Sequence, residues 1–221
     1  MPNLTKTPFL QIPSISQHFT GDFKGIEHLL PAEVLIVEKA STKRRADFST
    51  GRYCASQALS PFIKSRPAIL QGKGNEPLWP DGLVGSISHS KKLAGAVVAK
   101  QTDVTAIGVD IETLGGVKPD MWRLVFHDEE QALIRSKGND AATWATLLFS
   151  LKESFYKLQY PLTGLFVDFT DILITESNAK LIFSNTNPQK QFFPFNLNRI
   201  ETHWILIGDQ LITLCYIRRH S

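Results

Sequence analysis

The sequence has little cysteine, with Cys54 and Cys215 as its two cysteines in 221 residues. Two cysteines exclude a disulfide-rich scaffold, although one long-range bridge between them stays open. The sequence also lacks an uncharged apolar run of about 18–20 residues, the length of a membrane span. The first residues, Met1–Ser16, contain no apolar core of signal-peptide length. We therefore expect a cytoplasmic protein without a membrane span.

The sequence has only a small excess of positive charge. Lysine and arginine total 24 against 21 for aspartate and glutamate, which gives a net charge of +3. This excess permits an acidic partner or a phosphorylated ligand, but it is too weak to indicate nucleic-acid binding. Several local signatures are also absent: Gly72-Lys73-Gly74 lacks Walker spacing, and no Gly-x-Ser-x-Gly, His-Glu-x-x-His or Cys-x-x-Cys occurs.

The composition is that of a globular protein. Hydrophobic residues make up 43%, charged residues 20% and aromatic residues 10%, which excludes disorder, collagen and coiled coil. The length allows one compact unit or two lobes of about 100 residues each. Helical and strand periods alternate similarly in the two halves, so we predict an α+β protein of two lobes, 1–103 and 104–221.

The periodicity predicts the following elements. Residues Met1–Leu30 have no clear period and are predicted to be irregular, and Gln71–Gly85 is predicted to be a loop because it is rich in glycine and proline. Helices are predicted over Thr42–Ser60, Trp122–Arg135 and Ala141–Leu158. Strands are predicted over Val34–Val37, Leu83–Ile87, Leu93–Ala99, Val104–Ile111, Leu165–Phe169, Ile172–Thr175 and Leu181–Phe183, and a hairpin over His203–Ile207 and Leu211–Ile217.

The segment Gly108-Val109-Asp110-Ile111-Glu112 places two carboxylates on one predicted strand. Residues two apart point to the same face, with Cα atoms about 6–7 Å apart. This spacing suits one hard divalent cation held by two monodentate oxygens, as Mg²⁺ usually is. A strand end that emerges into solvent explains the same two residues equally simply.

The segment Ser150–Lys157 lies on the helix predicted over Ala141–Leu158. The apolar residues of this helix form one stripe, and Glu153 and Lys157 lie together beside that stripe. A glutamate four residues before a lysine is also the commonest surface ion pair on a helix, so this pair alone does not distinguish a site from a solvated surface.

Two further clusters could contact phosphate. Ser88-His89-Ser90 follows an apolar strand and offers hydroxyl and imidazole donors, but the same residues also make turns. Arg44 and Arg52 belong to a predicted helix, where Arg52 shares a face with Arg45. Arginine forks suit phosphate groups, although most arginines on helices are merely solvated.

Taken in order, these segments resemble the 4′-phosphopantetheinyl transferases of the Sfp type, and most of all the branch similar to enterobactin synthetase component D. The resemblance covers about Pro31–Leu158, and beyond it only the succession of strands agrees. The segments that carry it are Arg44-Arg45-Ala46-Asp47-Phe48 with Gly51-Arg52-x-Cys54-Ala55, Pro77-Leu78-Trp79-Pro80, Gly85-Ser86-Ile87-Ser88-His89, Gly108-Val109-Asp110-Ile111-Glu112 and Lys152-Glu153-x-x-x-Lys157.

The resemblance implies two α+β lobes related by a pseudo-twofold axis, with coenzyme A bound between them. It implies a monomeric enzyme that transfers the phosphopantetheine arm to a serine of an acyl, peptidyl or aryl carrier protein and releases adenosine 3′,5′-bisphosphate. The carrier would be an acidic helical domain, which suits the slight positive charge of the chain. Siderophore, nonribosomal peptide, polyketide and fatty-acid synthesis all stay open as pathways.

The matching positions also receive roles from the resemblance. Mg²⁺ would be bound by Asp110, Glu112 and Glu153 in the C-terminal lobe. The chemistry also needs a base for the attacking hydroxyl, and Glu153 could supply it directly or through a metal-bound water. Lys157, and also Lys152, would contact the pyrophosphate of the coenzyme. The remaining ligands of the coenzyme would be Arg44, Arg52, Lys73, Ser88 and His89, where Lys73 is displaced by one or two positions from the basic residue that relatives have before Pro-x-Trp-Pro.

Two other classes of function compete with this interpretation. A Mg²⁺-dependent nuclease or phosphoesterase also uses clustered carboxylates and a lysine, often as Glu-x-Lys on a strand. In this sequence the lysine follows its glutamate by four residues on a helix, and the basic excess is small. A non-catalytic scaffold would leave the order of the five polar segments unexplained.

Overall fold

The computed structural model describes residues 7–9, 11–190 and 196–219. The N-terminal half contains β1 (Ile15–Thr20), α1 (Pro31–Val37), α2 (Thr42–Leu59), β2 (Leu83–His89) and β3 (Ala94–Lys100). The C-terminal half contains β4 (Val104–Thr113), α3 (Trp122–Val125), α4 (Asp128–Ser136), α5 (Ala141–Thr163), β5 (Ile172–Ser177), β6 (Lys180–Asn185), β7 (Glu201–Ile207) and β8 (Gln210–Arg218). Short 3-10 turns η1 (Ile26–His28), η2 (Pro119–Met121), η3 (Gly138–Asp140), η4 (Phe169–Asp171) and η5 (Leu197–Arg199) join them.

The two halves have the same topology. Each begins with a strand, continues through helices and ends with an antiparallel pair of strands, and in each sheet the last strand lies in the middle. The orders are β1-β3-β2 and β4-β8-β7, while β5 and β6 form a separate hairpin. The predicted α+β class with two similar lobes is therefore confirmed. The boundary between 103 and 104 stays a prediction.

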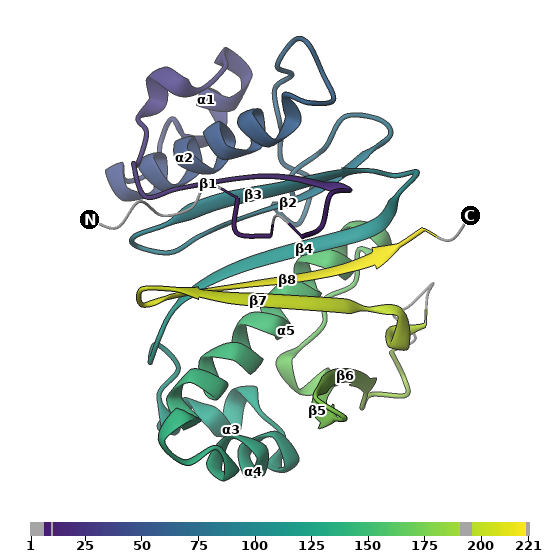
Figure 1. Cartoon of the computed structure of the whole chain (residues 1–221). Helices are drawn as coiled ribbons and strands as arrows, with labels where there is room; N and C mark the ends of the chain where they lie inside the picture. The colour runs from purple at the N-terminus through teal and green to yellow at the C-terminus, as the bar shows by residue number, and fades with distance from the viewer. Residues whose placement is uncertain (1–6, 10, 191–195, 220–221) are drawn as a thin grey trace.

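The elements form four layers, α2, the first sheet, the second sheet and α5 (Figure 1). Three apolar clusters fill the spaces between them. One contains Cys54, Ala58 and Leu59 of α2 packed on β3, and another contains Leu147, Leu151 and Phe155 of α5 packed on the second sheet. The third cluster lies between the sheets and joins β1 and β3 to β4 and β8. The halves thus share a core.

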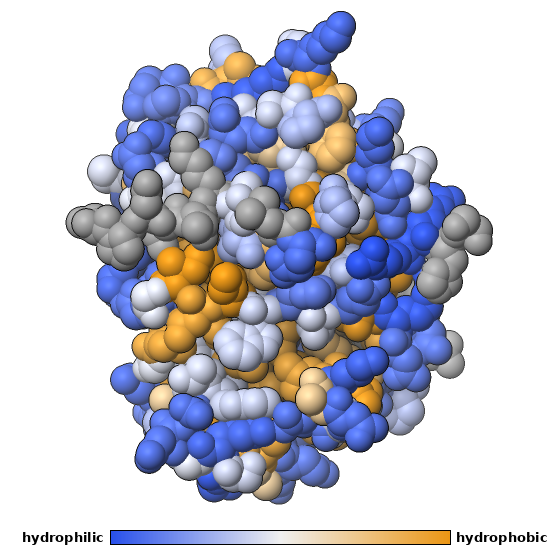
Figure 2. All heavy atoms as spheres, in the orientation of Figure 1, coloured by the Kyte–Doolittle hydropathy of each residue, from blue (hydrophilic) through white to orange (hydrophobic). Residues whose placement is uncertain are grey.

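The surface carries apolar side chains on the face around β7 and its turn to β8 (Figure 2), where Leu206 of β7 is exposed. In the described part of the chain, no helix has both the length and the apolar character that crossing a membrane requires. Cys54 and Cys215 are free and buried, so the bridge that the sequence left open is not formed. Burial raises the pKa of both thiols, that of Cys54 to about 12.

Most of the predicted strands and the helices α2 and α5 are confirmed, and two strand predictions are wrong. Residues Val34–Val37 belong to α1. Pro31 occupies the first helical turn, and the Glu33 carboxylate accepts from the Leu30 N–H at 2.9 Å, so local capping outweighs the β-branched run. Residues Leu165–Phe169 form no strand, because their carbonyls accept from side chains instead: Gln159 donates to Leu165 at 3.0 Å.

The predicted helix over Trp122–Arg135 is interrupted. It divides into α3 and α4 at Phe126 and His127, where the Glu130 carboxylate accepts from the His127 N–H at 2.9 Å and starts a new helix. The stretch predicted to be irregular contains β1, and its residues 1–6 and 10 lie outside the described residues. Helix α5 continues past Leu158 and ends at Gly164, which adopts the left-handed conformation of a C-cap with φ 65°.

Candidate active site

Helix α5 lies unusually close to β4 because Gly108 has no side chain. A Cβ atom at Gly108 would lie 1.9 Å from the carbonyl oxygen of Ser154 and 2.7 Å from the amide nitrogen of Leu158. Strand residues two apart share a face, so Asp110 and Glu112 lie on the same face of β4 as Gly108, toward α5. The close approach therefore brings the acidic pair of β4 together with the polar residues of α5.

The Asp110 carboxylate joins three elements of both halves. Lys157 Nζ of α5 donates to Asp110 Oδ1 at 2.6 Å and to Ser88 Oγ at 2.9 Å. Ser88 of β2 donates to the same Oδ1 at 3.0 Å, and Ser150 of α5 donates to Oδ2 at 2.9 Å. Asp110 is only 3% exposed, so this ion pair lies largely out of water at the seam between the sheets.

The other two predicted carboxylates lie beside this pair. Burial, together with the nearby carboxylates of Asp110 and Glu153 and against the opposing effect of Lys157, raises the pKa of Glu112 to about 7. Burial is also the main cause that raises the pKa of Glu153, with a contribution from Asp110. Three carboxylates thus share one lysine, and their negative charge is incompletely compensated.

This donor set fits Mg²⁺. Within the described ranges, no three His, Cys, Asp or Glu side chains already enclose a common point. Mg²⁺ usually takes one or two carboxylates together with phosphate oxygens of the substrate rather than a complete protein cage. Hard carboxylate oxygens that repel one another are the ligands that such an ion neutralises, so the residues present are chemically suited to it.

Basic and imidazole groups of the N-terminal half border the same seam. His89, at the end of β2, lies 3.9 Å from the buried Asp47 carboxylate of α2. Burial lowers the pKa of His89, and the cations Lys157, Arg44 and Lys43 lower it further, while Asp47 opposes the shift. The predicted residues Arg44 and His89 are therefore near one another and near Lys157.

Arg52 is buried in α2 rather than solvated. It is 5% exposed, its Nε donates to the Ile69 carbonyl at 2.8 Å, and its guanidinium lies 4.2 Å from the Phe48 ring centre. Burial lowers its pKa to about 10. Its Nη2 has no hydrogen-bond partner among the described residues. A buried, half-satisfied guanidinium costs free energy unless another acceptor reaches it, so Arg52 remains suited to an anionic ligand.

Lys152 is not brought together with these groups. Its side chain is buried, and its Nζ donates to Glu130 at 2.7 Å, to the Phe169 carbonyl at 2.8 Å and to the Val125 carbonyl at 3.0 Å. These acceptors use all three of its donors. The expectation that Lys152 contacts the pyrophosphate is therefore not supported: Lys152 ties α5 to α3, α4 and η4.

A pocket of about 260 Å³ opens at the seam. Its walls come from the loop before β2, from β2 itself and from α5, and they include Glu153, Lys157, Tyr156 and Tyr160. The same loop carries Lys73, which is exposed and adjoins the pocket residues Gly74 and Asn75. Lys73 thus lies at the rim of this pocket.

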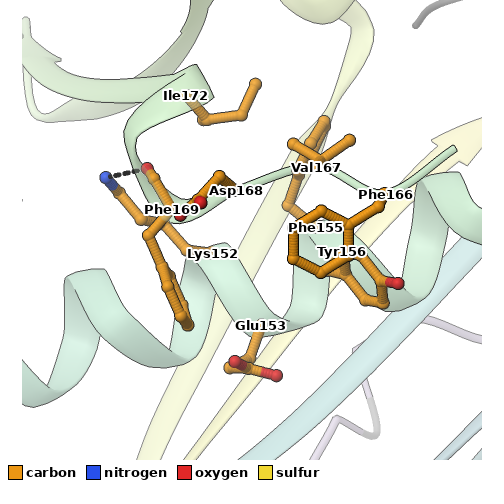
Figure 3. A pocket seen from close by; sticks show the side chains of 9 residues that line it. All are labelled: Lys152, Glu153, Phe155, Tyr156, Phe166, Val167, Asp168, Phe169 and Ile172. Atoms are coloured by element: carbon orange, nitrogen blue, oxygen red, sulfur yellow. Dashed lines mark hydrogen bonds between the residues drawn. The ribbon is translucent and has the colours of Figure 1, made fainter. Parts of the chain in front are cut away.

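A second pocket, of about 230 Å³, shares Glu153 and Tyr156 with the first. It lies between α5 and the segment that follows it, and its walls are mostly apolar (Figure 3). Lys152 points to the Phe169 carbonyl, on the far side of this pocket from Phe166 (Figure 3). The lining residues are Lys152, Glu153, Phe155, Tyr156, Phe166, Val167, Asp168, Phe169 and Ile172.

The sequence prediction of the site includes the hydroxyl of Ser88 but not its aromatic walls or the hydroxyl of Ser150. Tyr156, Tyr160 and Phe166 were not recognised because two of them flank apolar residues on α5 and the third lies in a segment predicted to be a strand. Ser150 gave a usable signal: it precedes Lys157 by seven residues and therefore shares a helix face with it. A small polar residue on that face indicates contact with another polar group.

Two protein-family models match the sequence and together cover most of it. The 4′-phosphopantetheinyl transferase N-terminal domain matches residues 32–99, and the 4′-phosphopantetheinyl transferase superfamily matches residues 106–215. The two matches meet near the connection between β3 and β4. The residues of the seam described above come from both matched regions.

Curated relatives agree with these matches. The chain is 38% identical to 4′-phosphopantetheinyl transferase Svp of Streptomyces mobaraensis over 65% of its own length and 59% of that protein. It is 35% identical to 4′-phosphopantetheinyl transferase PptT of Mycobacterium tuberculosis over 66% and 64%. It is 32% identical to enterobactin synthase component D of Salmonella typhi over 80% and 74%. The alignments with Svp and PptT thus span about three fifths of those relatives.

Proposed function

The chain belongs to the 4′-phosphopantetheinyl transferase superfamily, and on that premise we propose that it transfers the 4′-phosphopantetheine arm of coenzyme A to a serine of an apo carrier protein. One observation supports this most strongly. Lys157 and Glu153 of α5 line a pocket at the seam of the two halves, and Lys157 binds Asp110 of β4 and Ser88 of β2.

The reaction forms one bond to a phosphorus atom and breaks another bond to that same atom. The serine oxygen of the carrier attacks the pyrophosphate phosphorus that bears the pantetheine arm, and the bond from this phosphorus to the bridging oxygen breaks. Adenosine 3′,5′-bisphosphate leaves with that oxygen. The serine proton passes to the Glu153 carboxylate, whose raised pKa makes it a stronger base than an ordinary glutamate.

Cations hold the phosphates of the coenzyme during this step. Lys157 contacts the pyrophosphate and balances the charge that develops on the leaving oxygen. Arg44, Arg52 and His89 bind the remaining phosphate, with Arg52 using the Nη2 that has no partner in the described chain. Ser88 lies next to the phosphates at the end of β2 and keeps its hydroxyl bond to Asp110. Lys73 contacts the adenine side from the pocket rim.

Magnesium is the proposed cofactor. Asp110, Glu112 and Glu153 would hold it, and it would supply charge neutralisation for the pyrophosphate. The residues of the chain itself prepare the site: Ser88 and Ser150 fix the Asp110 carboxylate, which is buried. Glu112, whose pKa is about 7, loses its proton readily once a cation lies beside it.

The apolar pocket accommodates the uncharged arm of the coenzyme. The arm has amide and methyl groups but no charge, and Tyr156, Phe166 and Phe169 offer an apolar wall next to Glu153. An arm placed there has its phosphorus end near Glu153 and Lys157. This order of groups, with the phosphates at the seam and the arm beside α5, matches the chemistry of the two adjoining pockets.

The partner is an apo carrier protein with an acidic surface, as the net charge of +3 favours. The relative from Salmonella typhi is named as an enterobactin synthase component, and siderophore synthesis is accordingly the first pathway from which to take carriers. Carriers of nonribosomal peptide, polyketide and fatty-acid synthesis complete the set. We further propose a cytoplasmic, monomeric enzyme.

The experiment is intact-mass spectrometry of candidate apo carriers after incubation with the protein, coenzyme A and Mg²⁺. The proposal predicts a mass gain of one phosphopantetheine on at least one carrier. A carrier whose acceptor serine is replaced by alanine is the matched control and gains nothing. No mass gain on any of the carriers, with coenzyme A bound in calorimetry, would overturn the proposed activity.

A further inference from the structure

Three buried hydroxyls form a chain beneath the Asp110 carboxylate. Ser150 Oγ lies 2.9 Å from Asp110 Oδ2, Thr213 Oγ1 lies 2.8 Å from Ser150 Oγ, and Ser154 Oγ lies 2.7 Å from Thr213 Oγ1. All three hydroxyl residues are fully buried at 0% exposure. Thr213 lies on β8 directly opposite Asp110 in the β4–β8 ladder, and the two serines lie one turn apart on α5.

The number of protons on these hydroxyl groups fixes which group donates in each hydrogen bond. Each hydroxyl has one proton, and an ionised carboxylate only accepts. Ser150 therefore gives its proton to Asp110, and the single proton of the Thr213 hydroxyl is shared between the Ser150 hydroxyl at 2.8 Å and the Ser150 carbonyl at 3.0 Å. The Ser154 hydroxyl, in turn, donates either to the Thr213 hydroxyl at 2.7 Å or to the Thr213 carbonyl at 3.1 Å. Aligned donors of this kind strengthen one another and hold their acceptor in one orientation.

The two oxygens of Asp110 are used unequally. Oδ1 accepts from both Ser88 and Lys157, which fills its two acceptor positions, while Oδ2 accepts from Ser150 alone within the described chain. Rotation of the carboxylate would exchange these roles and break all three bonds. The Ser150 hydroxyl, held by Thr213, opposes that rotation and leaves one acceptor position on Oδ2.

From this geometry we propose that Ser150 and Thr213 are positioning residues, which orient the Asp110 carboxylate so that Oδ2 can bind a divalent cation. The inference rests on the proposed function, because it concerns the cation site of the same reaction. Neither residue touches a substrate or the reacting phosphorus. Groups that hold a metal ligand in place typically affect metal affinity by 10–100-fold, so the role has a measurable consequence without turnover.

The test is a titration of the folded, full-length protein with Mn²⁺, followed by electron paramagnetic resonance of the free ion. Ser150→Ala and Thr213→Val should each weaken Mn²⁺ binding by about 10-fold. Thr213→Ser keeps the hydroxyl and should restore the affinity to within about twofold of the original protein. If Thr213→Val does not fold, Ser150→Ala alone tests whether these hydroxyls orient Asp110.

The matched control is Thr146→Val. Thr146 of α5 is also fully buried; its hydroxyl donates to the Ala142 carbonyl at 2.9 Å and accepts from the Gly115 N–H at 3.2 Å without reaching Asp110. It should lower the melting temperature and leave Mn²⁺ affinity unchanged. Unaltered Mn²⁺ affinity in Ser150→Ala and Thr213→Val, while the original protein binds Mn²⁺ and modifies a carrier, would overturn this inference alone. An original protein that neither binds Mn²⁺ nor modifies a carrier would overturn the proposed function as well.

Discussion

At the scale of single residues, Glu112 has an unusual carboxyl group. Its ordinary pKa is 4.5, and in the folded protein burial raises it to about 7. The folded state therefore binds a proton that the unfolded chain releases as the pH rises above 4.5. Because the native state then holds more protons than the unfolded state, the free energy of unfolding falls as the pH rises from about 4.5 to about 7.

This shift predicts a pH-dependent melting temperature for the protein in the presence of a chelator. Calorimetry should show the melting temperature falling between pH 5 and pH 7.5, and Glu112→Gln should flatten this fall because it carries no titrating proton. Added Mg²⁺ should raise the melting temperature more at pH 7.5 than at pH 5, since it competes with protons. A Glu112→Gln profile parallel to that of the original protein would show that other groups cause the effect.

Arg44 and Arg45 are neighbours with different surroundings. Arg45 donates from Nε to the Val37 carbonyl at 3.2 Å and thereby caps α1, whereas Arg44 is exposed and lies near enough to His89 to lower the pKa of that imidazole. Arg44→Gln should weaken coenzyme A binding by about 1.5–3 kcal/mol, the scale of a hydrogen bond to a charged group. Dephospho-coenzyme A should be affected less if Arg44 binds the 3′-phosphate.

The control for Arg44→Gln is Arg45→Gln, which removes an equal charge one residue away. It should lower the melting temperature and leave the calorimetric affinity for coenzyme A within about twofold, well below one hydrogen bond. Equal losses of affinity in the two variants would mean that the general positive potential, and not a contact of Arg44, attracts the coenzyme.

At the scale of elements, the contact between α5 and β4 sets the geometry of the site. Gly108→Ala would place a methyl group 1.9 Å from the Ser154 carbonyl oxygen, and the helix backbone must then move. We expect the free energy of unfolding to fall by about 3 kcal/mol, as for an overpacked core, and transfer activity to fall further because Ser150 and Lys157 move away from Asp110.

Gly116→Ala is the matched control for this prediction. Gly116 lies in the loop after β4, and a Cβ atom there would meet one atom, the Thr113 carbonyl oxygen at 3.1 Å. Denaturant unfolding and carrier modification should both stay close to those of the original protein. Normal stability and activity in Gly108→Ala would show that the contact between β4 and α5 can accommodate a methyl group.

The elements also show what the sequence can and cannot predict. Periodicity correctly indicates α2, α5 and most strands, because their apolar faces are continuous and their caps or turns are clear. It fails where the decisive partner is distant. The Leu165–Phe169 segment has a strand-like composition, but its carbonyls are bonded by Gln159 and Lys152 from α5, which no local pattern reveals.

The same distinction applies to the site residues. Asp110 and Glu112 are recognisable from strand spacing, and Glu153 and Lys157 from helix spacing, so the motif indicates which side chains can meet. Lys152 belongs to the same motif, yet its Nζ is directed into the protein by Glu130 of α4, 22 residues away in sequence. The ion pair between the buried Glu130 carboxylate and Lys152 depends on how α4 packs against α5, so the local sequence does not predict it.

At the scale of the whole molecule, the seam between the halves is held by polar bonds as well as by the shared core. Ser86 of β2 accepts from the Val109 N–H of β4 at 3.0 Å, Ser88 binds Asp110 across the same boundary, and Lys92 pairs with Asp209. A ligand bound at this seam contacts both halves at once. Under the proposed function, the substrate phosphates would bind on a framework that is already fixed, which reduces the entropy cost of binding them.

The surface around α3 is a candidate for carrier docking. Leu124 is 66% exposed and Met121 40%, whereas Val117, Val125 and Phe126 of the same stretch are buried. Lys118 and Arg123 are exposed beside them. Helix α3 contacts η4, whose Phe169 lines the apolar pocket, so a carrier seated here lies near the proposed position of the coenzyme arm.

Arg123→Glu should raise the KM for an acidic carrier and leave the KM for coenzyme A unchanged, because charges at the rim act mainly on association. The effect should shrink at high salt as the charges are screened. Asp120→Lys reverses a neighbouring charge in the opposite sense and should lower the carrier KM at low salt. A carrier KM that stays the same in Arg123→Glu at low salt would place docking on another surface.

Transfer of a phosphopantetheine arm from coenzyme A to a carrier serine yields two products, and both can be measured in one reaction. Intact-mass spectrometry gives the amount of modified carrier, and chromatography of the same samples gives adenosine 3′,5′-bisphosphate. We expect the modified carrier and the bisphosphate to rise together in equal amounts, to require coenzyme A and to stop rising when a chelator is added. Bisphosphate release without carrier modification, or carrier modification without release of the bisphosphate, would contradict the proposed transfer.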